Sequence, residues 1–172
     1  MNAIDASGKM KRKKKKKKKK AGIALSYKAI EKKDKVGLIV FGKDVRSKVR
    51  PTDNFERILT EIAKVSAAQE TDIVKTINKA IEMFPKDKAT KHLLLLTDAL
   101  PTIGKRPERE TLKEVSKATS AGITISVVGI NLDEKGKNLA EQITTVGNGR
   151  LYKCKNLQKL DKIILQDYYS VL

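Results

Sequence analysis

Three short apolar runs place the strongest constraint on how this chain folds. They are residues 35–41, 92–97 and 123–129, and each is rich in Leu, Ile or Val. Runs of six or seven such residues are typical of strands buried on both faces of a parallel sheet. Stretches with the apolar spacing of helices alternate with them, at residues 21–30, 53–65, 72–84, 108–121, 138–146 and 157–171. We therefore predict an α/β domain whose mostly parallel central sheet is covered by helices on both faces.

Three weaker segments complete the predicted sheet. Residues 45–50 alternate Val or Ser with Arg or Lys directly after the turn Gly42-Lys43-Asp44, which predicts an antiparallel edge strand. Residues 151–154 form the last strand, and residues 1–4 form a first strand that is short for a central position. A chain of 172 residues fits one domain with a full core. The short start favours a domain cut from a larger polypeptide.

Polar side chains follow the predicted strands at their carboxyl ends, where ligands bind in open α/β sheets. Asp5 and Ser7 come directly after the first strand, and Asp98 follows the run that ends at Thr97. Thr71 precedes a helix expected to begin at Asp72, and its hydroxyl could equally cap that helix. Carboxylate and hydroxyl oxygens are the ligands that magnesium and manganese prefer. We predict a metal site in which these residues converge.

These residues also carry a family resemblance. Asp-x-Ser-x-x at residues 5–9, Thr-Asp at 71–72 and Leu-Leu-Leu-Thr-Asp at 94–98 resemble the von Willebrand factor A (VWA) domain. The metal-ion-dependent adhesion site (MIDAS) of that family has the pattern Asp-x-Ser-x-Ser, then Thr, then Asp. The resemblance implies a three-layer, Rossmann-like fold with one antiparallel edge strand. It also implies that Mg²⁺ (or Mn²⁺) is bound by four of the family's five positions: Asp5, Ser7, Thr71 and Asp98.

The fifth position of the pattern is Lys9, where the family has Ser. An ammonium group has no lone pair to give to a cation. Lys9 would therefore weaken metal binding, or would itself neutralise Asp5 and Asp98 in place of the metal.

The resemblance implies a function in recognition, without catalysis. In such domains the metal captures an acidic residue of a protein partner. Residues 34–41 and 96–98 are most similar to the VWA copies that accompany AAA+ ATPases in magnesium-chelatase and cobaltochelatase-like systems. We therefore expect a partner domain of an AAA+ ATPase.

Enzyme functions have less support in the sequence. Gly8-Lys9 lacks the remaining residues of a P-loop, and no Gly-x-Gly-x-x-Gly follows the first strand. A metal-dependent phosphohydrolase with Asp5 as nucleophile would need a second acid two residues later, where Ser7 stands. The only histidine, His92, lies at the end of its run remote from Asp98, so we interpret it as structural or exposed.

Charge is concentrated in one segment. The net charge is +18, and residues 9–20 contribute eleven cations and no acid. A nucleic-acid-binding module is therefore an alternative function. The run occupies the place where a helix needs apolar residues to pack on the sheet. We interpret it instead as a solvated or disordered run, or as a stand-in for residues of unknown identity.

Two compositional features favour a cytoplasmic protein. The single cysteine, Cys154, excludes an intramolecular disulfide and favours a reducing compartment. No apolar run is long enough to span a membrane, and the first residues lack the apolar core of a signal peptide.

We predict that residues 9–20 do not control the affinity of the chain for nucleic acid. Titration of random duplex DNA at two salt concentrations measures this. We expect binding weaker than micromolar at physiological salt. Micromolar or tighter binding with a steep salt dependence, caused by counterion release from the phosphates, would instead support the nucleic-acid function.

Overall fold

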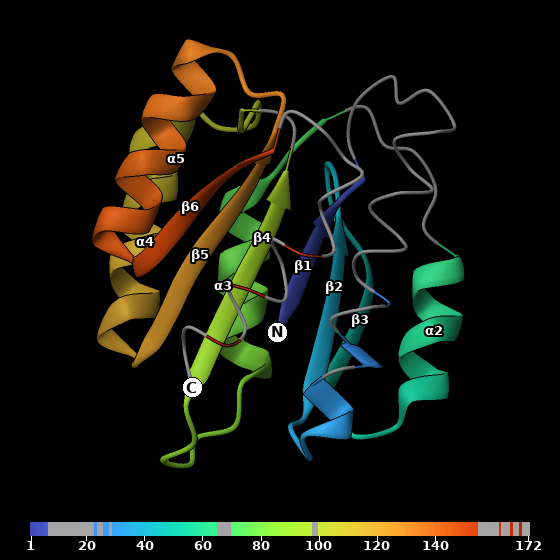
Figure 1. Cartoon of the computed structure of the whole chain (residues 1–172). Helices are drawn as coiled ribbons and strands as arrows, with labels where there is room; N and C mark the ends of the chain where they lie inside the picture. The colour runs from blue at the N-terminus through green and yellow to red at the C-terminus, as the bar shows by residue number, and fades with distance from the viewer. Residues whose placement is uncertain are drawn as a thin grey trace.

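One sheet organises the protein (Figure 1). The computed structural model describes residues 1–6, 23, 26–27, 29–64, 70–97, 100–154, 162, 166 and 169. The described strands form a six-stranded sheet in the order β3-β2-β1-β4-β5-β6. They are β1 (Asn2–Asp5), β2 (Val36–Phe41), β3 (Val45–Thr52), β4 (Lys91–Thr97), β5 (Ile123–Ile130) and β6 (Asn148–Cys154).

All neighbouring strands are parallel except β2 and β3, which pair antiparallel at one edge. β1 lies in the middle, with Ala3 opposite Ile39 of β2 and Leu95 of β4. The turn at residues 42–44 is too short for a crossover, so β3 must return beside β2. The predicted α/β fold with a mostly parallel sheet and one antiparallel edge strand is confirmed.

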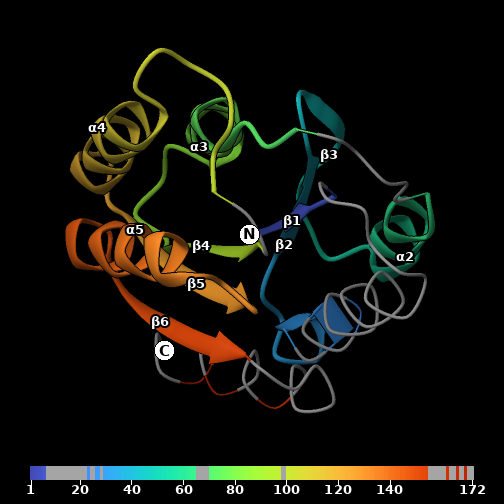
Figure 2. The same cartoon turned by 90° about the horizontal axis from the view of Figure 1, so that it is seen from above.

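Helices cover both faces of the sheet. The described helices with assigned bounds are α2 (Phe55–Ala63), α3 (Ile73–Met83), α4 (Pro107–Ser120) and α5 (Glu134–Val146). Seen from above, α3 and α4 lie on one side of the sheet and α2 on the other (Figure 2). The described helical residues between 23 and 31 share the side of α2, because Ile23 and Ile30 pack in the same core as Ile58 and Ile62.

Each face has its own hydrophobic core, because successive strand residues point to opposite sides. Ala3 packs in the core beneath α3, α4 and α5, whereas its neighbour Ile4 packs in the core beneath α2. In β2, Ile39 belongs to the first core and Val40 to the second. Both faces of the central strands are thus buried, as their continuous apolar runs predicted.

Two predicted boundaries are wrong by three residues or more. α5 begins at Glu134 instead of residue 138, because Asp133 caps it by accepting a 2.7 Å hydrogen bond from the Gly136 amide. That first turn contains no apolar residue to reveal its period. β6 begins at Asn148 instead of residue 151. A Cβ at Gly149 would lie 2.0 Å from the Ile125 carbonyl oxygen, so glycine allows the strand to start there.

The predicted helix at residues 157–171 lies largely outside the described residues, and the polybasic run at 11–20 lies wholly outside them. Within the described part of the chain, no helix combines the length and apolar character that crossing a membrane requires.

His92 has a structural environment at the beginning of β4. Its Nε2 lies 3.0 Å from the Ser126 hydroxyl on β5, and the same hydroxyl accepts a 3.1 Å hydrogen bond from the Arg150 amide. Burial, together with the positive charges of the Met1 amino group and Arg150, lowers the pKa of His92 to about 3. The imidazole is therefore neutral in the folded protein at neutral pH.

We predict that His92 makes the protein less stable as the pH falls below about 6.5, the ordinary pKa of histidine in an unfolded chain. Below that pH the His92 imidazole is protonated in the unfolded chain but stays neutral in the folded protein. The free energy of unfolding therefore falls by about 1 kcal/mol for each unit that the pH decreases. Urea unfolding between pH 7 and pH 5 measures the slope. Since His92 is the only histidine, His92→Gln should flatten it. An unchanged slope in this variant would contradict the assignment.

Candidate functional site

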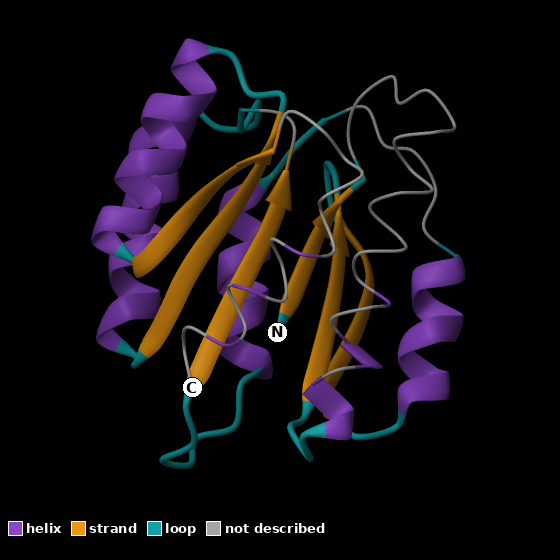
Figure 3. Ribbon diagram, viewed as in Figure 1, coloured by secondary structure: helices purple, strands orange, loops and turns teal. Residues whose placement is uncertain are grey.

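The carboxyl ends of β1 and β4 lie side by side at one edge of the sheet. The arrowheads of these two parallel strands point to the same edge (Figure 3). After β1 the chain continues into the helical residues on the face of α2, whereas after β4 it continues into α4 on the other face. Neighbouring strands whose connections leave to opposite faces mark the switch point where open α/β sheets bind ligands.

Asp5 is the last residue of β1, and its side chain is completely buried. Its Oδ2 accepts a 2.6 Å hydrogen bond from the Thr97 hydroxyl at the end of β4. A buried carboxylate is costly unless donors or cations stabilise it. The Thr97 hydroxyl therefore both stabilises the charge of Asp5 and orients its carboxylate at the switch point.

Thr71 is also buried, at 1% exposure, in the segment that precedes α3. Two hydrogen bonds join its backbone to Thr102 in the loop after β4. The Thr71 amide donates to the Thr102 hydroxyl at 3.1 Å, and the Thr102 amide donates to the Thr71 carbonyl at 3.0 Å. The loop after β4 thereby fixes the backbone of Thr71.

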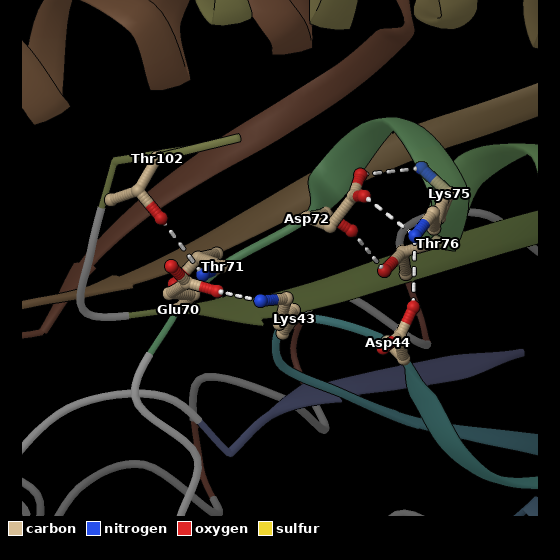
Figure 4. A network of polar contacts seen from close by, with 8 residues as sticks. All are labelled: Lys43, Asp44, Glu70, Thr71, Asp72, Lys75, Thr76 and Thr102. Carbon is tan, nitrogen blue, oxygen red and sulfur yellow. Dashed lines mark hydrogen bonds and ion pairs between the residues drawn. The ribbon is translucent and has the colours of Figure 1, made fainter. Parts of the chain in front are cut away.

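The cap of α3 is Asp72, and the sequence-based alternative that Thr71 caps this helix is wrong (Figure 4). Asp72 Oδ1 accepts a 2.8 Å hydrogen bond from the Lys75 amide. The Asp72 amide donates to the Gly42 carbonyl at 2.7 Å, which ties this segment to the turn between β2 and β3. Capping therefore does not account for the burial of Thr71.

Ion pairs surround this backbone connection (Figure 4). Lys43 lies 3.3 Å from Glu70, and Lys75 lies 2.8 Å from Asp44 and 3.6 Å from Asp72. The hydrogen bond and charge of Lys75 lower the pKa of the exposed Asp44 carboxyl. Most of these groups are exposed to solvent, so each pair contributes little to stability.

Of the predicted ligands, the structure describes Asp5 and Thr71. Ser7, Asp98 and the fifth-position Lys9 lie outside the described residues. Asp5 and Thr71 each have further polar interactions besides these hydrogen bonds. The described residues include no group of three or more His, Cys, Asp or Glu arranged to bind a metal. The convergence of all four predicted ligands therefore stays a prediction.

Two residues of this region have roles that the sequence did not reveal. Thr97 is part of the Leu-Leu-Leu-Thr-Asp pattern, so the sequence indicated its position beside the site. The pattern did not indicate its hydrogen bond to Asp5. Thr102 had no local signal, because its partner Thr71 lies 31 residues away in the chain.

The fold and the switch point define a class of protein: a doubly wound α/β domain with a polar edge at the ends of β1 and β4. A model of the von Willebrand factor type A domain matches residues 1–100, more than half of the chain. The chain belongs to this family, whose domains commonly mediate protein–protein interactions. A comparison with curated proteins gave no match.

Solved structures agree with this fold. An aerotolerance-related membrane protein from Bacteroides fragilis, carrying multiple mutations to serine, is 22% identical with a TM-score of 0.79, over 99% of this chain and 98% of that one. The protein BatB from Bacteroides thetaiotaomicron is 20% identical with a TM-score of 0.75, over 99% and 96%. The von Willebrand factor type A protein from Catenulispora acidiphila is 17% identical with a TM-score of 0.72, over 96% and 40%. Likeness at this identity concerns the fold alone.

We predict that Thr97→Val destabilises the protein by about 2 kcal/mol, because it removes a hydrogen bond to a buried carboxylate. Thr97→Ser, which keeps the hydroxyl, should lose less. Urea unfolding at pH 7 measures both. Thr60→Val is the matched control, since the exposed Thr60 hydroxyl donates to the Glu56 carbonyl of its own helix. Equal losses in Thr97→Val and Thr60→Val would show that the contact with Asp5 contributes nothing.

Proposed function

We propose that this domain is a metal-ion-dependent protein-interaction module of the MIDAS type. Asp5, Ser7, Thr71 and Asp98 would bind Mg²⁺ (or Mn²⁺), and an acidic residue of a partner protein would complete the coordination. The observation that carries the proposal is the pairing of Asp5 with Thr97 at the switch point of a VWA domain. No group in the proposed site acts as a catalyst.

The described residues fit a hard cation in their chemistry. Asp5 offers a carboxylate and Thr71 a hydroxyl, which are the oxygen ligands that magnesium prefers. Both residues are buried. The hydrogen bond from Thr97 orients the Asp5 carboxylate, and the two bonds with Thr102 hold the backbone of Thr71. Because these ligands are already ordered, less conformational entropy would be lost when a cation binds.

The charges of this donor set favour a partner carboxylate. Two carboxylates and two neutral hydroxyls would leave open positions for water around a divalent cation, because magnesium usually keeps several waters. When bound, the cation would supply the positive charge that attracts an acidic side chain. The hydrogen bond from Thr97 to Oδ2 would hold the Asp5 carboxylate in one orientation at this site.

The partner and the location belong to the same proposal. The sequence features of residues 34–41 and 96–98 favour an AAA+ ATPase as the partner, to be tested by co-purification with magnesium and with EDTA. The single cysteine favours a cytoplasmic location. The similar Bacteroides fragilis protein is described as a membrane protein, so cell fractionation is the direct test of location.

We predict that replacing Lys9 by Ser strengthens magnesium binding. Serine restores the fifth oxygen of the family pattern, whereas the lysine ammonium repels a cation and gives it no lone pair. Isothermal titration calorimetry with MgCl₂ on the native chain and on Lys9→Ser measures the change. We expect an affinity higher by about tenfold or more, equivalent to about 1.4 kcal/mol.

Two control variants keep this test specific. In the Lys9→Ser background, Asp5→Asn should abolish magnesium binding, whereas Asp53→Asn, on an exposed residue before α2, should not change it. Equal binding by the native chain and Lys9→Ser would show that Lys9 points away from the metal. Binding that survives Asp5→Asn would overturn the proposed site.

A further inference from the structure

A cavity of about 650 Å³ opens at the base of the sheet, the edge where β1, β2 and β4 begin. The end of β3 and the end of α3 also line this base cavity, because β3 runs antiparallel to its neighbours. Its volume lies within the range of about 300–1,000 Å³ typical of ligand sites. The base lies at the opposite edge of the sheet from Asp5 and Thr97. Nothing in the proposed metal-dependent function uses it.

The wall of the base cavity combines apolar surface with one buried amide. Val36, Met83 and Leu94 contribute apolar side chains that are at most 5% exposed. Asn2 also lines the cavity and is 3% exposed. Among the described residues, no hydrogen-bond partner of the Asn2 side chain is found. The fully buried side-chain polar atoms without a partner in the described residues are on Thr111 and Glu114. The Asn2 amide is therefore open to the cavity, where a ligand can reach it.

The rim of the base cavity is cationic. Lys33, Lys35, Arg50 and Lys91 line it, against Asp34 and Asp87. Within the described part of the chain, Lys33, Lys35 and Lys91 have no ion pair. Arg50 donates a hydrogen bond at 3.4 Å to the Glu82 carbonyl. This excess of cationic groups complements an anionic ligand.

We propose that the base cavity binds a short segment of a partner protein in which an apolar residue is flanked by acidic residues. The apolar side chain would occupy the space beside Val36 and Leu94, which lie on the same face of the sheet as Asn2. The acidic residues would face the lysines. The Asn2 amide carries both a donor and an acceptor. A peptide group offers the same pair, whereas an acyl chain would leave the amide without partners.

Nuclear magnetic resonance titration of the whole chain in EDTA tests this proposal separately from the metal site. The probes are blocked tetrapeptides made from Leu, Phe, Asp and Glu in permuted order, with a reference set in which Lys replaces the acidic residues. We expect the acidic set, and not the reference set, to shift the side-chain amide signals of Asn2. Sodium decanoate and inorganic phosphate serve as competing ligand classes.

Variants link the binding to named residues. Asn2→Leu should weaken the best peptide by about tenfold, because its hydrogen bonds are lost. The Asn2→Leu protein should have the same thermal stability as the native chain, because the substitution removes no hydrogen bond to the described residues. The double variant Lys35→Gln/Lys91→Gln should weaken the same peptide and reduce its salt dependence. Lys48→Gln is the control, since Lys48 is exposed on β3 and does not line the cavity.

Four results would overturn the proposal. They are the absence of any shift with the acidic set, equal binding of the lysine set, binding of decanoate without peptide, and phosphate binding that matches peptide binding. The third would indicate an acyl-chain site and the fourth a simple cationic patch. Failure of magnesium binding would leave this test unaffected, because it is carried out without the metal.

Discussion

β1 is completely buried between β2 and β4, and this burial sets the chemistry at the centre of the sheet. Helices cover both faces of this central strand and neighbours pair with both of its edges, so all four of its residues are buried. Its last residue is nevertheless a carboxylate. A buried charge persists only where polar partners surround it, and the Thr97 hydroxyl at 2.6 Å is one of them. The chemistry of the carboxyl edge therefore begins with the position of Asp5.

Backbone hydrogen bonds, more than surface ion pairs, determine where Thr71 lies. The segment that contains it is bonded to Gly42 on one side and to Thr102 on the other. The accompanying pair of Lys43 and Glu70 has side chains that are 68% and 46% exposed, where water weakens their attraction. We infer that the loops after β2 and β4 position Thr71, and that the charges around it mainly adjust the surface potential met by a partner.

The two edges of the sheet have different chemistry, so the two proposed binding events would use separate surfaces of one domain. The carboxyl edge presents the oxygen atoms of Asp5 and the backbone-restrained Thr71. The base presents apolar walls, the Asn2 amide and a cationic rim. Because the strands separate these edges, occupation of one does not block access to the other. The two proposed sites would therefore contact two different segments of a partner.

The amino-acid pattern alone specifies which segments become buried strands and helices, because apolar periodicity is a local property of the chain. It also placed Asp5 and Thr71 at segment ends, where side chains of parallel strands meet at one edge. It missed the first turn of α5, the start of β6 and the cap of α3. The hydrogen bond from Thr97 to Asp5 and the restraint of Thr71 by Thr102 depend on how the chain folds. Thr97 and Asp5 are separated by 92 positions in the chain, and Thr102 and Thr71 by 31. No local pattern specifies a partner at such a separation.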